Sequence, residues 1–171
     1  MIIDIHPKDN KESVFNKVQI FLQQNNFKIS NQDQSRPWGG FFVIDESQAS
    51  FFASVFFPHL KMSDIEVTAK LSPKILIVAP NERLSWQFHY RRSEIWKVIN
   101  GQVGFVRSVN NNENPSKTLI TGDCVMLKKE ERHRLIGLDS WAIVAEIWQH
   151  TDIENPSNEE DIVRIQDDFG R

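Results

Sequence analysis

From Lys74 onward the chain consists of short apolar segments that are interrupted at regular intervals. The segments are rich in Val, Ile, Phe and Trp, which are the residue types favoured in β-strands. The residues that separate them are Pro80, Gly101, an Asn-rich stretch at 110–115, Gly122 and Gly137. This spacing predicts an antiparallel all-β unit with strands at 74–79, 84–90, 94–99, 103–109, 117–120, 124–127, 133–136 and 141–148. Eight strands suit a jelly roll or a small barrel.

The N-terminal part of the chain has a different pattern. At 9–26, apolar residues recur at the spacing of an amphipathic helix, and Asp9 and Glu12 are placed as a capping pair. A second short helix is expected at 46–57, because Pro58 must end it. Its apolar residues are nearly continuous, so a strand is also possible there.

Composition and length restrict the domain organisation and the location. The 171 residues are 40% apolar, which is enough to bury the core of one domain. No repeat or linker divides the chain, so we expect a single domain over 1–171 with an N-terminal helical extension at about 1–35. The longest apolar run, 51–57, is far shorter than the roughly 20 residues of a membrane-spanning helix. With no secretory pattern at the N-terminus, we expect a cytoplasmic protein without a membrane partner.

Charge and cysteine content narrow the class of partner. The net charge of -3 argues against nucleic-acid binding, which needs many lysines and arginines to neutralise phosphates. Cys124 is the only cysteine, which excludes an internal disulfide and a multi-cysteine zinc module. We therefore expect a small-molecule partner.

The residues with the clearest chemistry lie in and after the segment 81–101. Gln87 and His89 are two apart on a predicted strand, so their side chains point to one face. Glu94 begins the next predicted strand after a tight connection, and a later strand offers His133. An amide oxygen, two imidazoles and a carboxylate form a mixed set that suits a divalent transition metal such as Zn, Mn, Fe or Co.

The spacing of these residues resembles the first motif of the cupin family, in which a glycine precedes His-x-His, a glutamate and a closing glycine. Gln87 stands in the place of the first histidine and Gly101 in that of the closing glycine, whereas Asn81 replaces the opening one. The segment 122–135 resembles the second cupin motif, and its histidine falls on His133. The resemblance implies a mainly β fold, the cupin double-stranded β-helix or jelly roll, with one or two N-terminal helices.

Three separated segments are similar, more specifically, to the cupin domain of type II mannose-6-phosphate isomerases, which is often fused to a mannose-1-phosphate guanylyltransferase. These segments are RPWGGF at 36–41, LSWQFHYRRSEIWKV at 84–98 and EEDIVRIQDDFGR at 159–171. The last segment implies that the acidic C-terminal stretch belongs to the fold, although its composition alone is that of a solvated tail. The chain has neither a Gly-rich phosphate loop nor the length for a transferase domain, so we expect a stand-alone cupin domain.

The resemblance implies a metal-dependent isomerase that interconverts an aldose phosphate and a ketose phosphate, with mannose 6-phosphate and fructose 6-phosphate as the expected pair. A divalent metal, expected to be Zn, would be held by Gln87, His89, Glu94 and His133. The sugar's phosphate group needs guanidinium or ammonium partners, and the candidates are Arg36, Arg91, Arg92, Lys97 and Arg164. Lys74 is placed like a lysine that precedes the Leu-Ser-x-Gln segment in related isomerases, which makes it a candidate catalytic group. The general base is not assigned, and a homodimer is compatible with the resemblance because cupins are often dimers.

Three positions depart from the family pattern. The family usually has three consecutive histidines where this chain has His89, Tyr90 and Arg91. Ile95 stands where the family has a histidine before the tryptophan. The loss of these imidazoles leaves a second hypothesis open, a cupin that binds a sugar or sugar phosphate without turning it over. An iron oxygenase is a third hypothesis, but such sites usually present three histidines and this one offers two.

Two groups of residues have structural alternatives. The five tryptophans could form a sugar-stacking surface, but aromatic residues in a small barrel usually fill its core. Arg36 and Arg164 could form salt bridges with the acidic C-terminal stretch instead of contacting phosphate.

Overall fold

The computed structural model describes residues 3–68 and 70–170 of the chain. Its helices are α1 (Lys11–Gln24), the short 3-10 helix η1 (Glu46–Gln48), α2 (Ala49–Phe56) and α3 (Met62–Ile65). Its strands are β1 (Ile29–Asp33), β2 (Gly39–Ile44), β3 (Leu71–Val78), β4 (Trp86–Phe88), β5 (Arg92–Asn100), β6 (Gln102–Ser108), β7 (Lys117–Ile120), β8 (Cys124–Leu127), β9 (Arg132–Gly137), β10 (Ala142–His150) and β11 (Val163–Gln166).

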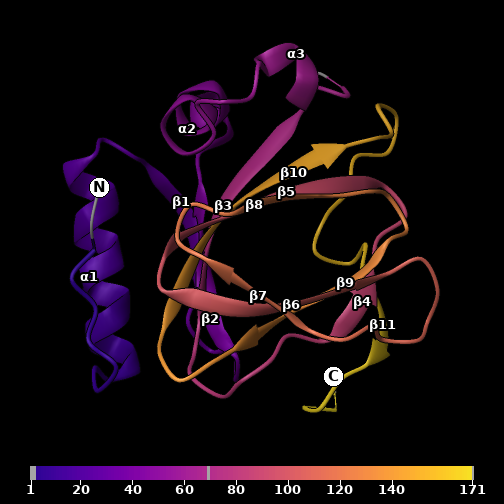
Figure 1. Ribbon diagram of the computed structural model, residues 1–171. Coiled ribbons are helices and arrows are strands. Elements are labelled where there is room, and N and C mark those ends of the chain that lie inside the picture. Colours follow the sequence, from indigo (N-terminus) through magenta and orange to yellow (C-terminus); the bar gives the residue numbers. More distant parts are fainter. Residues whose placement is uncertain (1–2, 69, 171) are drawn as a thin grey trace.

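The strands form two antiparallel sheets that face each other (Figure 1). The larger sheet has the order β1-β2-β3-β10-β5-β8, and the smaller has the order β11-β4-β9-β6-β7. Neighbours in each sheet are mostly distant in the sequence, as in a jelly roll. The predicted mainly β jelly roll is confirmed, and each of the eight predicted strands is present. The strands at 117–120 and 124–127 have the predicted ends, and the ends of the others are shifted by one to three residues. Three further strands, β1, β2 and β11, were not predicted.

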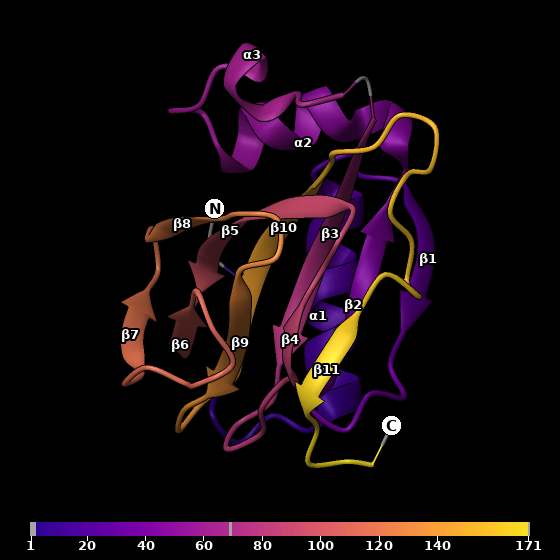
Figure 2. The same ribbon diagram turned by 90° about the vertical axis from the view of Figure 1, so that its right-hand side faces the viewer.

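Two apolar layers flank the larger sheet. One layer fills the space between the sheets and includes Leu76, Val144 and Phe105. The other packs α1 and α2 against the opposite face, where Phe15 lies 5.5 Å from Phe42 between ring centroids. Figure 2 shows α1 on the side of the larger sheet away from β4, β9 and β11. Every residue of β3 and β10 is buried, because both faces of these central strands are covered.

The two helical predictions are confirmed with one correction. Helix α1 is capped by Asn10, whose side chain accepts a hydrogen bond from the Ser13 backbone N–H, and not by the predicted pair Asp9 and Glu12. Asp9 instead accepts hydrogen bonds from the backbone N–H of His6 and from the Lys17 ammonium. The segment predicted at 46–57 is helical, as η1 and α2, and not a strand.

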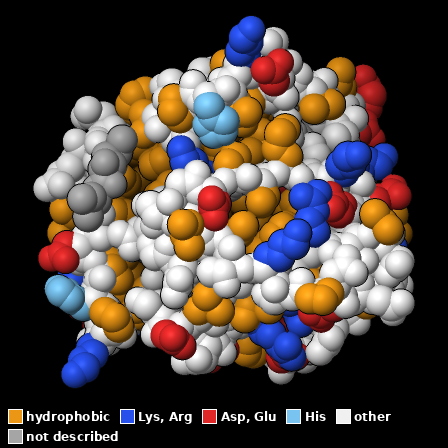
Figure 3. All heavy atoms as spheres, in the orientation of Figure 1, with side chains coloured by type: hydrophobic (Ala, Val, Ile, Leu, Met, Phe, Trp, Pro, Cys, Tyr) orange, Lys and Arg blue, Asp and Glu red, His pale blue; other side chains and the backbone are white. Residues whose placement is uncertain are grey.

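The extension predicted at about 1–35 is helical only in part, because β1 lies within it as an edge strand of the larger sheet. Residues 1–2 of that extension, and Arg171 at the end of the closing segment, lie outside the described residues. None of the helices within 3–68 and 70–170 is both long and apolar enough to cross a bilayer. On the face shown in Figure 3, basic side chains are interspersed with acidic and apolar ones.

Candidate metal centre

Three buried side chains from different parts of the sheets converge between them. His89 directly follows β4, Glu94 lies in β5 and His133 lies in β9. One potential ligand atom from each lies within 4.8 Å of the other two. Nε2 of His89 is 3.2 Å from Oε1 of Glu94, and Nε2 of His133 is 3.4 Å from Oε2 of the same carboxylate. The structure therefore brings three of the four predicted metal ligands into one cluster.

Backbone carbonyls fix the orientation of both imidazoles. Nδ1 of His89 lies 2.6 Å from the carbonyl oxygen of Asp161, and Nδ1 of His133 lies 2.8 Å from that of Glu131. A carbonyl oxygen only accepts, so each Nδ1 carries a proton and donates it. In the neutral ring the lone pair is then on Nε2, which is the nitrogen facing Glu94. Metal-binding histidines in proteins are oriented in this way.

The unsatisfied atoms of the cluster fit a cation. Among the described residues, Nε2 of His133 and Oε2 of Glu94 have no hydrogen-bond partner, although both are buried. Burial lowers the pKa of His133 to about 4, so its ring is neutral at pH 7 and both atoms are acceptors. Two buried acceptors 3.4 Å apart are unfavourable without a proton or a cation between them. A divalent metal would satisfy both atoms.

Glu94 is held in its ionised form by its neighbours. Burial by itself raises the pKa of this carboxyl, but His89, Arg92 and His133 lower it, and the net pKa lies well below the usual value. Arg92 donates from Nε to Oε1 at 2.8 Å, which leaves Oε2 facing His133. The carboxylate is thus available as a charged ligand at neutral pH.

The predicted fourth ligand, Gln87, lies beside the cluster. It pairs with His133 across β4 and β9, and it lines the same pocket as Glu94. Its Oε1 accepts a hydrogen bond from the Ser85 hydroxyl at 2.6 Å. An amide oxygen has two lone pairs, so Oε1 retains one for a metal.

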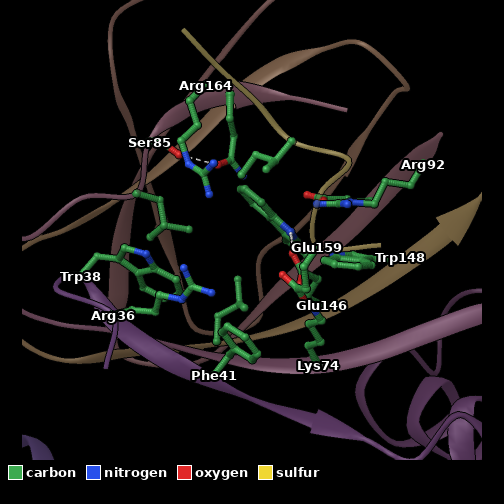
Figure 4. Close-up of a pocket in the computed structure, with 16 residues that line it drawn as sticks. Arg36, Trp38, Phe41, Lys74, Ser85, Arg92, Glu146, Trp148, Glu159 and Arg164 are labelled. Carbon is green, nitrogen blue, oxygen red and sulfur yellow. Dashed lines mark hydrogen bonds and ion pairs between the residues drawn. The ribbon is translucent and has the colours of Figure 1, made fainter. Parts of the chain in front are cut away.

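The pocket next to the cluster combines four cationic side chains with aromatic and acidic ones. Figure 4 shows Arg36, Trp38 and Arg164 on one side of it and Lys74, Trp148 and Arg92 on the other. Of the residues predicted to contact the sugar phosphate or to act in catalysis, the structure places four along this pocket. They are Arg36, Lys74, Arg92 and Arg164.

Two of the predicted phosphate ligands lie elsewhere. Lys97 alternates with Trp96 along β5, so it points to the opposite face of the sheet, into a depression lined by Phe21 and Phe56. Arg91 donates to Asn155 Oδ1 at 2.5 Å and to the carbonyl oxygen of Pro156 at 3.2 Å. The structure therefore does not bring Lys97 or Arg91 to the pocket.

The remaining arginines differ in how firmly they are held. Arg92 is buried and donates to Glu94, to the Ser157 hydroxyl and to the carbonyl oxygen of Asn158. Its Nη2 also donates to Nε2 of His89 at 3.1 Å in the metal-free cluster. Its guanidinium carbon also lies 3.6 Å from the ring centroid of Trp148. Arg36 forms an ion pair with Asp33 of β1 at 2.8 Å, and not with the acidic C-terminal stretch considered in the sequence. Arg164 lies on β11 opposite Gln87.

Sequence reasoning missed one buried acid of the pocket. Glu146 is buried in β10 and accepts a hydrogen bond at 2.8 Å from the indole N–H of Trp96. Burial and the nearby charge of Glu94 raise the pKa of Glu146 to about 8. The signal was present, because Glu146 is the single acid within the otherwise apolar segment 142–148. A carboxylate on a strand buried on both faces needs a local reason.

Lys74 is a buried cation enclosed by aromatic rings. Its ammonium lies 3.4 Å from the ring centroid of Trp148 and 4.8 Å from that of Phe41, and it forms an ion pair with Glu159. Burial lowers the pKa of Lys74, while the charges of Glu146 and Glu159 oppose that shift. Trp38 and Trp96 pack in the core between the sheets, as expected for aromatic residues in a small barrel, and they also line the pocket.

The acidic C-terminal stretch is part of the site. The carboxylate of Asp161 accepts hydrogen bonds from the backbone N–H groups of Tyr90 and Arg91, both at 3.0 Å. Its backbone carbonyl orients His89, as described above. The expectation from the resemblance, that this stretch belongs to the fold, is confirmed.

The surroundings of His150, at the end of β10, predict that the stability of the protein depends on pH. The hydroxyl of Ser72 donates to Glu46 at 2.6 Å, so Nε2–H of His150 donates to the Ser72 oxygen at 2.8 Å. Nδ1 of His150 is buried with no partner among the described residues. Burial therefore lowers the pKa of His150 to about 4.

We expect the free energy of unfolding to fall as the pH falls from about 6.5 to about 4. In this range the unfolded chain protonates His150 and the folded chain does not, so the full contribution is present only above pH 6.5. The loss amounts to about 3 kcal/mol at most. Urea denaturation across this range should show a flatter pH profile for His150→Gln than for the wild type. His59→Gln, at an exposed position, should retain the wild-type profile; parallel profiles for all three proteins would contradict the prediction.

Comparison with known proteins places these features in a family. Residues 45–167 match the family model described as mannose-6-phosphate isomerase C-terminal. A segment of 80 residues is 32% identical to mannose-1-phosphate guanylyltransferase 2 of Escherichia coli O157:H7, and this match covers 47% of the chain but 12% of that protein.

One of two similar solved structures supports the same fold. An oxalate decarboxylase variant of Bacillus subtilis superposes over 79% of this chain and 30% of its own, with a TM-score of 0.55 and 10% identity. A cupin 2 conserved barrel domain protein from Salinispora arenicola superposes over 49% of this chain and 65% of its own, with a TM-score of 0.42 and 21% identity. At 10% identity, the likeness to the decarboxylase variant concerns the fold alone. Because the family model covers more than half of the sequence, the chain belongs to the mannose-6-phosphate isomerase C-terminal family and has its cupin-type domain.

Proposed function

We propose that the protein is a metal-dependent aldose–ketose isomerase that acts on a sugar phosphate, with mannose 6-phosphate and fructose 6-phosphate as the substrate pair. The observation that carries this proposal is the buried cluster of His89, Glu94 and His133 beside a pocket lined by cations. The family supports the choice of sugar phosphate, and the cluster supports a metal-dependent reaction.

The metal would be held by Nε2 of His89 and of His133, by Glu94 and by the amide oxygen of Gln87. When bound, a divalent ion supplies Lewis-acid polarisation of the substrate oxygens at carbons 1 and 2. Zn suits this nitrogen and oxygen set, as do Mn, Fe and Co.

The cations of the pocket would bind the phosphate group. A dianion needs guanidinium forks or an ammonium group, and Arg36, Arg164 and Lys74 lie around the pocket in which the sugar would extend from the metal (Figure 4). Arg92 is less suited, because its donors already serve Glu94 and the C-terminal stretch. Its role is to hold Glu94 and to fix the wall of the pocket.

The reaction also needs a group that removes a proton from carbon 2 and returns it to carbon 1. Glu146 is the carboxylate of the pocket best suited to this step, because Glu94 is committed to the cluster and one oxygen of Glu146 is fixed by Trp96. The pKa of Glu146, raised to about 8 by burial and by Glu94, makes it a stronger base than an ordinary glutamate. A base with a pKa near the working pH is the more efficient one.

The second candidate, a cupin that binds a sugar phosphate without turning it over, was suggested by the replaced histidines. Tyr90 is 53% exposed and packs on Phe88, and Ile95 is buried in the apolar layer under the helices. Neither these side chains nor that of Arg91 lines the pocket described here. Their replacement removes no acid or base from the pocket, which favours the isomerase.

Incubation with sugar phosphates in heavy water tests the proposal. Metal-loaded protein is offered hexose, pentose and heptose phosphates, and deuterium at carbon 2 is measured by NMR. We expect exchange and ketose formation with mannose 6-phosphate, loss of both with a chelator, and recovery with a divalent metal. Binding without exchange would establish the second candidate, and neither binding nor exchange would contradict both.

A further inference from the structure

One carboxylate in the pocket comes from the surface of the molecule. The side chain of Glu159 is 58% exposed, whereas that of Lys74, with which it forms an ion pair, is 4% exposed. Glu94 is held by Arg92 and by the histidines, and Glu146 is held by Trp96. Glu159 differs from these two, because the contact described for its carboxylate is the one with the Lys74 ammonium. Figure 4 shows this pair beside Trp148 at the edge of the pocket.

The backbone on both sides of Glu159 is anchored, so its side chain can leave Lys74 without any opening of the chain. The carbonyl oxygen of Asn158 accepts from Arg92 at 3.1 Å, and its side chain accepts from Arg91 at 3.2 Å. On the other side, the carboxylate of Asp161 is fixed by two backbone N–H groups. Rotation of an exposed side chain between these anchors carries the carboxylate into solvent.

The buried ammonium is stabilised by a counter-anion. Lys74 lies against Trp148 and Phe41, in surroundings where an unpaired charge is unfavourable. A ligand that displaces Glu159 must therefore bring negative charge of its own. A phosphate group does so and forms a charge-assisted hydrogen bond with the ammonium, whereas a neutral sugar leaves Lys74 unpaired.

We infer that Glu159 is an internal competitor of the anionic ligand: its carboxylate occupies the anion position on Lys74 in the ligand-free pocket, and an anionic ligand displaces it. The inference rests on the proposed function for the identity of the ligand, a sugar phosphate. Glu159 thus lowers the affinity for phosphorylated sugars, because part of the population holds the closed ion pair.

Binding of inorganic phosphate and of mannose 6-phosphate to the full chain tests the inference, by calorimetry at constant ionic strength. We expect Glu159→Gln to bind both about tenfold more tightly than the wild type, because no internal anion competes. Binding of neutral mannose should change less than about twofold, since a neutral sugar has no charged group that could take the anion position on Lys74. Glu160→Gln is the matched control: it removes the same charge from the neighbouring exposed residue and should leave phosphate binding as in the wild type.

A second variant tests whether the length of the side chain at position 159 matters when its charge is kept. Glu159→Asp keeps the charge but shortens the side chain by one carbon–carbon bond, about 1.5 Å, and should also bind phosphate more tightly. Thermal unfolding shows whether each variant is folded, and phosphate should raise the Tm of Glu159→Gln more than that of the wild type. If Glu159→Gln and Glu159→Asp bind phosphate no more tightly than Glu160→Gln, the ion pair is only structural and the inference is wrong.

The same measurements distinguish this inference from the proposed function. Tighter phosphate binding by the Glu159 variants, with no deuterium exchange by the wild type, would support the inference and contradict the isomerase. Exchange by the wild type, with equal phosphate binding by all variants, would support the isomerase and overturn the inference.

Discussion

Replacement of His133 by asparagine is expected to weaken metal binding by more than about 100-fold and to abolish isomerisation. Loss of a group that merely orients a metal ligand already costs roughly 10- to 100-fold in metal affinity or activity, and His133→Asn removes the ligand atom itself. Nε2 of His133 is the buried acceptor that faces Oε2 of Glu94 at 3.4 Å, and the shorter asparagine does not reach that position. Metal content by mass spectrometry and competition with a chelator measure the effect.

The fold of the variant is the necessary control. The ring of His133 is neutral when no metal is bound, because burial lowers its pKa to about 4, so replacement by a neutral amide leaves no unpaired charge. Metal should raise the Tm of the wild type and of the exposed variant His59→Asn, but not that of His133→Asn. Full metal occupancy and activity in His133→Asn would show that the metal binds elsewhere.

The strands that could be predicted from the sequence are those whose burial produces a recognisable pattern of apolar residues. The central strands β3 and β10 are covered on both faces, which produces apolar runs that are easy to recognise. The three missed strands lack such a pattern: β1 reads ISNQD and is largely exposed, and β11 reads VRIQ within an acidic stretch. Both form at sheet edges by pairing with a neighbour, β2 for β1 and β4 for β11. Pairing of this kind cannot be inferred from a local window.

Strand β2 was missed for a different reason. It begins with two glycines, which in a local pattern indicate a turn. Gly39 has a φ of 129°, and a Cβ at this position would lie 1.9 Å from the carbonyl oxygen of Ile77 on β3. Glycine is therefore required by the close approach of the two strands, and this requirement exists only in the folded sheet.

The candidate site was predictable where its residues lie close together in sequence. Alternation along one strand placed Gln87 and His89 on one face, and the predicted strands that follow offered Glu94 and His133. The same alternation argues against Lys97, which is three residues after Glu94 and so on the opposite face of β5.

The other pocket residues depend on how the sheets face each other. Glu146 and Trp148 on β10 meet Lys74 of β3 because these strands are neighbours, with Glu146 directly paired with Lys74. Glu159 reaches Lys74 from 85 residues away. No spacing in the sequence encodes these contacts.

Replacement of Glu146 by glutamine is expected to lower kcat by about 10²- to 10⁴-fold, the contribution of a positioned acid or base. The amide keeps an oxygen that accepts the hydrogen bond from Trp96, so the arrangement of the pocket is preserved. Because the pKa of Glu146 is raised to about 8, the carboxyl is mainly neutral at pH 7 before metal or ligand binds, and a neutral amide costs little stability. KM for mannose 6-phosphate and metal content should change little. Stopped assays of ketose formation give kcat and KM, and Glu66→Gln, at an exposed position, is the control.

The pH dependence of the rate separates proton transfer from positioning. In the wild type, kcat should rise with pH as Glu146 loses its proton, through a pKa above that of an ordinary glutamate. This rise should be absent from the residual activity of Glu146→Gln, since the variant has no group to ionise there. If Glu146→Gln instead keeps more than about a tenth of the wild-type kcat with the same rise, Glu146 only positions Trp96.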